Sequence, residues 1–168
     1  MKTKSSGTLI LAAAFTIMLA FTTPAQNAQA SDSLRDLPGT NPHALVGTWT
    51  ANSVITNCAG TTLFTHTKFA SFTQSATAVE TSTSPLRTAA LGIWEHAGLN
   101  TFRYMLNFYR YNPDNTLAGS TRAIWTVTMN AFNDGYTAEA SVQMIAPNGT
   151  VFATLCGAET GTRMRFPE

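Results

Sequence analysis

Short runs that alternate apolar and polar residues follow one another from residue 47 onwards, and turn-forming residues separate them about every ten positions. This spacing is typical of antiparallel strands joined by short turns. No stretch after residue 30 keeps the apolar period of a helix. The pattern predicts eight strands, at residues 48–56, 64–74, 76–82, 88–96, 101–111, 119–132, 136–145 and 150–162.

The predicted reversals carry residues suited to turns. Residues 97–100, 112–115, 133–135 and 147–149 each contain Gly, Asn, Asp or Pro. Eight antiparallel strands in one small domain leave no exposed edge when they close on themselves. The predicted fold is therefore all-β, a closed eight-stranded antiparallel up-and-down barrel over residues 45–168.

A tryptophan stands at the start of the first predicted strand. Gly47 lets the entering backbone turn tightly, and the indole of Trp49 is large enough to plug one end of a small barrel. An arginine from the last strand is expected to cover that indole, and the sequence offers both Arg163 and Arg165 for this position. These four residues are expected to be structural.

The apolar positions of each strand are expected to face the lumen. Small inward residues, such as Gly92 and the alanines, leave room beside large aromatics, which indicates an aromatic-walled pocket with little charge. A barrel of this size either fills itself with side chains or holds one small ligand, and the sequence leaves both readings open. The predicted ligand-binding residues are Trp94, Phe102, Tyr104, Leu106, Phe108, Arg110, Trp125, Val127, Met129, Tyr136, Ala138, Ala140 and Val142.

The other face of the predicted strand 101–111 is also rich in apolar side chains. Met105, Tyr109 and Tyr111 are expected to point outward. We interpret them as ordinary surface residues, with a partner-binding patch as the alternative.

The first 30 residues have the pattern of an export signal. Lys2 and Lys4 precede an apolar run, and Ala28 and Ala30 frame a cleavage site. The apolar run is too short to span a bilayer comfortably, so no transmembrane segment is expected after cleavage near Ala30. Residues 31–44 are predicted to be a flexible leader, with one helical turn at 42–45. The remaining protein is expected to be periplasmic or extracellular.

Charge argues against nucleic acid as a partner. The full chain has a formal net charge of +1, and cleavage of the export signal removes Lys2 and Lys4 and makes the net charge slightly negative. Apart from Arg163 and Arg165, the basic residues are scattered singly, whereas phosphate binding requires clustered Lys and Arg. We expect a monomer that binds no nucleic acid.

The two cysteines lie near opposite ends of the predicted barrel sequence. Cys58 follows the first strand and Cys156 lies in the last, and such a pair in an exported protein usually forms a disulfide. First and last strands are neighbours in a closed barrel, so a bridge would secure the closure. Two buried free thiols are the alternative. Cys58 has the opposite parity to Trp49, which places the bridge outside the lumen.

Three short motifs and the strands between them resemble bacterial secreted proteins of the calycin-like (lipocalin-like) barrel superfamily. The motifs are Gly47-Thr48-Trp49, Gly92-Ile93-Trp94-Glu95 and Gly161-Thr162-Arg163. The resemblance implies a cup-shaped barrel that binds small hydrophobic molecules. The chain departs from the typical lipocalin pattern in its short loops and in having no helix after Phe166, so a long hinged lid is not expected.

No specific catalytic constellation is present. His43, His66 and His96 form no chelating pair, so no metal site is predicted, and no cofactor is expected. Four charged residues of the strands are interpreted as solvated surface charge, namely Glu80, Glu95, Arg103 and Arg110. Arg110 is a partial exception, because it shares its parity with Tyr104 and Phe108 and is positioned to meet an anionic head group at the rim.

The predicted function is therefore non-catalytic binding of a small apolar or amphipathic ligand. One alternative is a periplasmic interaction module similar to barrel protease inhibitors. Another is an isomerase or cyclase similar to the allene oxide cyclase group, which works by shaping an apolar substrate and would depend on Glu80 or Tyr104.

Overall fold

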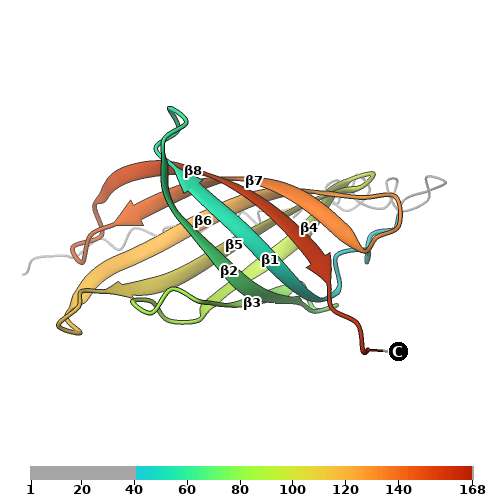
Figure 1. The fold of residues 1–168 in the computed structure, drawn as a ribbon, viewed down its shortest axis with the longest axis horizontal. Helices are drawn as coiled ribbons and strands as arrows, with labels where there is room; N and C mark the ends of the chain where they lie inside the picture. Colours follow the sequence, from blue (N-terminus) through green and yellow to red (C-terminus); the bar gives the residue numbers. More distant parts are fainter. Residues whose placement is uncertain (1–40, 168) are drawn as a thin grey trace, which may run out of the picture.

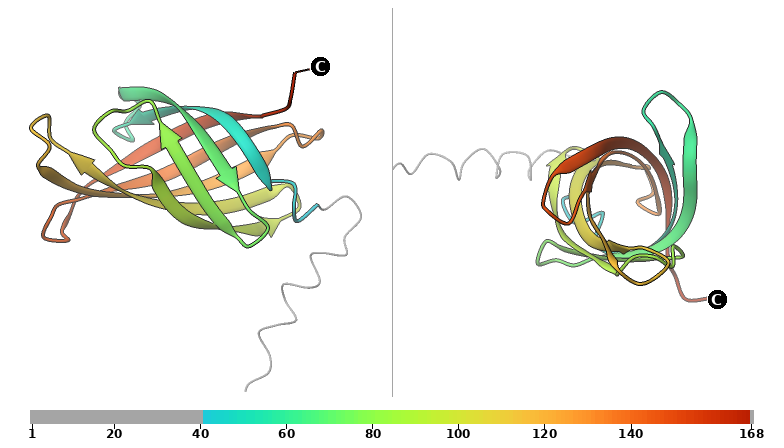
Figure 2. Two further views of the ribbon diagram at one scale, coloured as in Figure 1. Left: turned by 90° about the horizontal axis from the view of Figure 1, so that it is seen from below. Right: turned by 90° about the vertical axis from the view of Figure 1, so that its left-hand side faces the viewer.

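The computed structural model describes residues 41–167, and these residues form a closed antiparallel barrel (Figure 1). The strands run up and down in chain order, and β8 returns to pair with β1. Figure 2 shows the strands closing into a ring when the molecule is viewed from one end. The predicted fold class is thus confirmed.

All eight predicted strands are present, with ends that differ by a few residues from those expected. They are β1 (Gly47–Thr56), β2 (Thr62–Phe72), β3 (Thr77–Ser82), β4 (Ala90–Gly98), β5 (Thr101–Tyr111), β6 (Leu117–Met129), β7 (Gly135–Ile145) and β8 (Val151–Arg163). The shortest contact is between β3 and β4, which pair only from Thr77 opposite Ile93 to Glu80 opposite Ala90. None of the described residues forms a helix long and apolar enough to cross a membrane.

Alternation of buried and exposed side chains follows the predicted parity. In β6, Ala123, Trp125 and Val127 are buried and the residues between them are more exposed. The expected inward residues of β5 also lie inside. The core therefore runs along the axis of the barrel, and its apolar content comes from every second residue of each strand.

One end of the barrel is closed by Trp49. Its side chain is fully buried, and its indole Nε1 donates a hydrogen bond to the carbonyl oxygen of Leu45, 2.9 Å away. Leu45 belongs to the hydrogen-bonded turns at residues 42–45 that lead into β1. At Gly47 the backbone φ is +134°, a conformation that residues with a Cβ rarely adopt.

Arg163 covers the Trp49 indole, which settles the choice between the two arginines. Its guanidinium carbon lies 4.3 Å from the centre of the indole. The same guanidinium donates hydrogen bonds to the carbonyl oxygens of Val46 at 2.7 Å, Asn133 at 2.9 Å and Ala44. It therefore joins the entry to β1, the β6–β7 turn and the end of β8.

Replacing Arg163 by lysine is expected to lower the free energy of unfolding by about 2 kcal/mol, because an ammonium group cannot make three divergent hydrogen bonds while stacking on an indole. Arg165→Lys is the matched control. Arg165 is exposed, and among the described residues its one ion pair is the 3.7 Å contact with Asp134, so a change below about 0.5 kcal/mol is expected. Urea denaturation of both variants measures the difference, and equal effects would contradict this role for Arg163.

The predicted disulfide is present between Cys58 and Cys156, whose Cα atoms are 4.9 Å apart. Cys156 lies in β8 opposite Thr56, the last residue of β1. Its neighbours of the same parity, Ala158 and Thr160, are exposed. The bridge therefore joins β8 to the turn that follows β1 from the outside of the barrel, as the parity predicted.

The predicted export signal, its cleavage site near Ala30 and all but the last residues of the predicted 31–44 leader lie outside the described residues.

Candidate functional site

A cavity of about 250 Å³ lies in the half of the barrel away from Trp49, among the ends of the strands. It is partly open to solvent, and most of its wall is apolar. The principal apolar side chains come from four strands and leave a space between them. They are Ile55, Leu106, Phe108, Trp125, Val142 and Met144.

Lys68 forms the floor of this cavity together with Glu80. The Lys68 side chain is buried, and its Nζ lies 2.7 Å from Glu80 Oε2 and also contacts Glu159 Oε2. It lies 4.5 Å from the centre of the Trp125 ring, within the range of a cation–π contact. Contacts with two carboxylates and an aromatic face offset the free-energy penalty of removing the lysine charge from water, so the charged lysine can lie in the interior.

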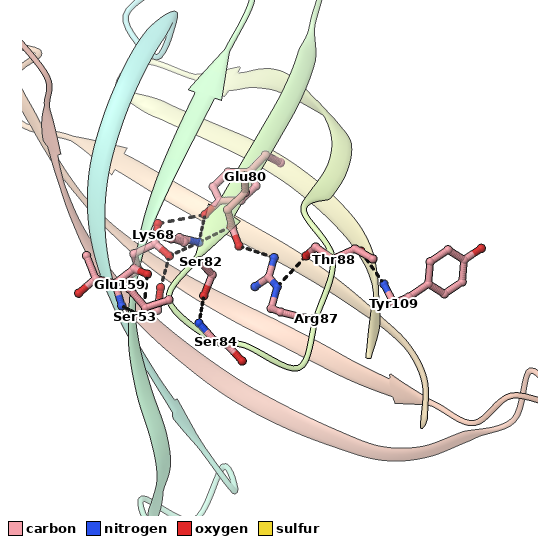
Figure 3. A network of polar contacts seen from close by, with 12 residues as sticks. Ser53, Lys68, Glu80, Ser82, Ser84, Arg87, Thr88, Tyr109 and Glu159 are labelled. Carbon is pink, nitrogen blue, oxygen red and sulfur yellow. Dashed lines mark hydrogen bonds and ion pairs between the residues drawn. The ribbon is translucent and has the colours of Figure 1, made fainter. Parts of the chain in front are cut away.

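Glu159 is held from several sides, deeper in the barrel than Glu80. Its Oε1 accepts hydrogen bonds from the hydroxyls of Tyr136 at 2.6 Å and Tyr104 at 3.1 Å, and its Oε2 accepts one from Ser53 at 2.6 Å. Figure 3 shows Lys68 between the two carboxylates. The polar groups thus form one connected and satisfied network, which is what a buried polar cluster requires.

The segment between β3 and β4 turns an arginine into the barrel. Arg87 Nη2 lies 2.9 Å from Glu80 Oε1, and its guanidinium carbon is 3.6 Å from the centre of the Phe108 ring. The backbone of this segment pairs with the end of β5, where Thr88 N donates to Tyr109 O at 3.0 Å. Tyr109 N in turn donates to Thr88 Oγ1 at 3.2 Å (Figure 3). Arg87 therefore contributes both to the wall of the cavity and to the charge balance of its floor.

Burial and charge shift the titration of the groups around the floor. Burial raises the pKa of Glu80, but the nearby charges of Lys68 and Arg87 outweigh burial and leave that pKa below its ordinary value. Burial and the Glu159 carboxylate raise the pKa of Tyr104 well above its ordinary value. The network therefore holds a charged Glu80 carboxylate and neutral Tyr104 and Tyr136 phenols at neutral pH.

His66 lies beside this network on β2 and lines the cavity. Its Nδ1 is buried and has no hydrogen-bond partner within the described part of the chain. Burial, followed by the positive charge of Lys68, lowers the pKa of His66 below 6.5. The imidazole is therefore neutral at pH 7 and adds no charge to the cavity wall.

Five of the predicted ligand-binding residues line the cavity. These are Leu106, Phe108, Arg110, Trp125 and Val142. Arg110 is half-buried, and its guanidinium donates to backbone carbonyl oxygens of β6 and β7.

The other predicted residues lie nearer the Trp49 end. Tyr104 and Tyr136 belong to the polar network, and the Trp94 indole donates to Thr73 O at 2.8 Å in the β2–β3 turn. Ala140 pairs with Trp125 and is half-buried. The rest are core residues, namely Phe102, Val127, Met129 and Ala138.

Two expectations about orientation were wrong. Glu80, interpreted as a surface charge, is 3% exposed because Lys68 and Arg87 supply its counter-charges inside the barrel. Tyr111, expected on the outer face of β5, lines the cavity at the last residue of β5, beside the point where the β5–β6 register shifts. The extra residue of this irregularity is Ala118 on β6, and pairing becomes irregular at such a position. Glu95 and Arg103 are on the outside, as expected.

Sequence reasoning missed Lys68, Glu159 and Arg87 as parts of the site. A signal was available for the first, since Lys68 has the same parity as the buried Ala70 and Phe72. Glu159 likewise alternates with exposed residues and shares its parity with Gly161. A side chain at Gly161 would collide with the Tyr136 ring, so that glycine makes room for a tyrosine that binds Glu159. Arg87 lies in the loop between β3 and β4, where no alternation of buried and exposed residues indicates which way a side chain points.

Within residues 41–167, no three His, Cys, Asp or Glu side chains lie close enough together to hold a metal ion. The geometry instead offers an apolar space above a neutralised polar floor. Such a space can hold a small molecule and orient it by its polar end. None of the protein-family models, curated proteins or solved structures with which the chain was compared matches it.

Proposed function

We propose that this protein is an exported calycin-like barrel that binds a small apolar or amphipathic molecule in the cavity beside Trp125 and does no chemistry on it. The observation that supports this proposal is the cavity itself. Its volume is about 250 Å³, and its walls are mainly apolar although the barrel is narrow enough to be filled by side chains.

Small residues keep the cavity free of side-chain atoms. Ala123 lies between Leu106 on β5 and Val142 on β7 in the register of the sheet, and all three line the cavity. A larger residue at position 123 would project into the same space. The volume corresponds to roughly eight water molecules in the liquid, which suits a ligand on the order of ten non-hydrogen atoms.

Export is supported by the disulfide between Cys58 and Cys156, since such bonds persist mainly in oxidising compartments. The signal pattern of residues 1–30 is in keeping with this assignment. The proposed location is the periplasm or the extracellular medium, and the proposed state is a monomer that acts by carrying or sequestering its ligand.

Replacing Ala123 by phenylalanine tests the cavity as the binding site. The phenyl ring is expected to occupy the cavity and weaken binding of octanoate or octan-1-ol by about a hundredfold or more, because the ligand loses its apolar contacts. Titration calorimetry measures this effect, and recovery of the ligand by mass spectrometry shows whether it is chemically unchanged. Thr126→Phe, on the outside of the same strand, is the matched control and should bind as the parent does.

Equal binding by the Ala123→Phe variant, provided that it melts cooperatively, would place the site elsewhere. Failure of the unmodified protein to bind any apolar or amphipathic probe would contradict the proposed function as a whole.

A barrel isomerase is the second candidate, and one observation favours it. Glu80 and Tyr104, which the sequence suggested for such a role, both contact Lys68 Nζ, at 2.7 and 3.3 Å. However, the lowered pKa of Glu80 makes it a weak base, and the raised pKa of Tyr104 makes it a weak acid. Neither group is suited to exchanging protons near pH 7, so binding is the better supported function.

A further inference from the structure

We propose that the ligand is an amphiphile with a single anionic head group and a short apolar chain, and that Arg110 binds the head group. This inference rests on the proposed function, because it names the chemical class that the same cavity accepts. It follows from the distribution of charge around the cavity rather than from the shape of the cavity.

The charges at the floor are balanced without a ligand. Lys68 and Arg87 are the two cations, and Glu80 and Glu159 are the two carboxylates that they contact. These four side chains are nearly or fully shielded from water. A further charge at this depth would have no counter-charge left to pair with, so a ligand should present only apolar atoms here.

Arg110 is the cation of the cavity that has no carboxylate within ion-pair distance among residues 41–167. Its backbone bridges to that of Arg87 at the β5 end, but the Arg87 guanidinium turns inward to Glu80. Arg110 therefore leaves one uncompensated positive charge where the cavity meets the strand ends. An anion is the ligand group that this charge attracts, whereas a cation is repelled.

The present contacts of Arg110 leave much of its hydrogen-bonding capacity free. Its guanidinium donates to the carbonyl oxygens of Ala118 and Ser120 at 3.5 Å and of Ile145 at 3.3 Å. These distances exceed the usual 2.7–3.2 Å range for such bonds. Burial also lowers the pKa of Arg110, which means that its surroundings disfavour the charged form. A bidentate oxyanion would supply shorter bonds and the missing counter-charge together.

The orientation of the ligand follows from these positions. Leu106, Trp125 and Val142 provide apolar walls deeper along the axis, and Arg110 lies close to the β5–β6 turn. The apolar chain should therefore extend toward Trp125 while the head group stays at Arg110. Carboxylates, sulfates and phosphate monoesters share the required chemistry of a compact oxyanion.

The test compares octanoate, octan-1-ol and octylammonium as probes of the oxidised protein by titration calorimetry. Octanoate is expected to bind about tenfold or more tightly than octan-1-ol, and octylammonium more weakly than either, because a charged hydrogen bond to a guanidinium adds to the shared apolar contacts. Octyl sulfate is the second anionic probe. Tighter binding of octyl sulfate would assign the head group to a sulfate or phosphate ester, and weaker binding would assign it to a carboxylate.

Arg110→Gln is expected to reduce octanoate affinity about tenfold and to leave octan-1-ol affinity unchanged. Arg110→Lys, which keeps the charge, should retain part of the preference for the anion. It still tests the proposal if the Arg110→Gln variant does not fold. Arg122→Gln is the matched control, since Arg122 is exposed on the outer face of β6.

Equal affinities for octanoate and octan-1-ol in the unmodified protein would overturn the anionic class while leaving apolar binding intact. An equal loss of both ligands in Arg110→Gln and Arg110→Lys would overturn the role of Arg110. Absence of binding by every probe would instead overturn the proposed function on which this inference rests.

Discussion

Replacing Lys68 by methionine is expected to lower the free energy of unfolding by about 3 to 5 kcal/mol, because it leaves buried carboxylates without their cation. Methionine has a similar length and no charge, so the loss should come mainly from Glu159, whose other partners are neutral hydroxyls. Glu80 would retain Arg87. Denaturation in urea, followed by the fluorescence of the three tryptophans, measures this change.

Part of the lost free energy of unfolding should be recovered when the unpaired charge of Glu159 is removed as well. Lys68→Met combined with Glu159→Gln is expected to be more stable than Lys68→Met alone, because the glutamine is neutral. Arg103→Met is the control for loss of an exposed ion pair, and we expect less than about 1 kcal/mol there, since Arg103 and Glu95 are 3.4 Å apart and largely solvated. A Lys68→Met variant as stable as the Arg103→Met variant would show that the buried network contributes no net stability.

Removing the disulfide by replacing Cys58 and Cys156 with alanine is expected to lower the free energy of unfolding by roughly 4 to 5 kcal/mol. The two cysteines are 98 residues apart in sequence. Their bond restricts nearly the whole unfolded barrel chain, which is the physical reason for so large an effect. The melting temperatures of the oxidised protein, the reduced protein and the double variant measure the contribution.

Reduction of the parent protein should bring its melting temperature close to that of the double alanine variant. Thiol titration of the oxidised protein under denaturing conditions should find no free sulfhydryl. Two titratable thiols, or a double variant that melts with the oxidised parent, would contradict a stabilising bridge.

The barrel could be predicted because the sequence signals for its strands and turns are local and recur along the chain. Alternation in β6 and β7 identified the inward faces, and the turns at 112–115 and 147–149 marked the reversals, as the structure confirms. The closure of the sheet into a barrel could be predicted from the number of strands and from the lack of a helical pattern in the sequence. The position of Trp49 and the pairing of Cys58 with Cys156 could be predicted for the same reason, since each depends only on which strands are first and last.

The pairing of charges in the polar floor could not be predicted, although the parity of Lys68 pointed inward, because it depends on residues that are distant in sequence. Lys68, Glu80 and Glu159 lie on three different strands, and each by itself has the composition of a surface position. A charged residue enters the core only when its partners enter with it. That condition depends on the register between strands, which alternation does not specify for polar residues. Tyr111 was misplaced for a related reason, since the pairing of β5 with β6 becomes irregular beside it and strict alternation does not foresee such a position.

The short pairing of β3 with β4 bears on where the barrel opens. These strands pair over the four residues from Thr77 to Glu80, whereas β5 and β6 pair along most of their length. Opening at this position breaks few backbone hydrogen bonds, so it requires only a fraction of the free energy of global unfolding. The disulfide holds β1 and β8 together elsewhere in the ring. The pairing of β3 with β4 is therefore where the ring is expected to open locally, well before the barrel unfolds as a whole.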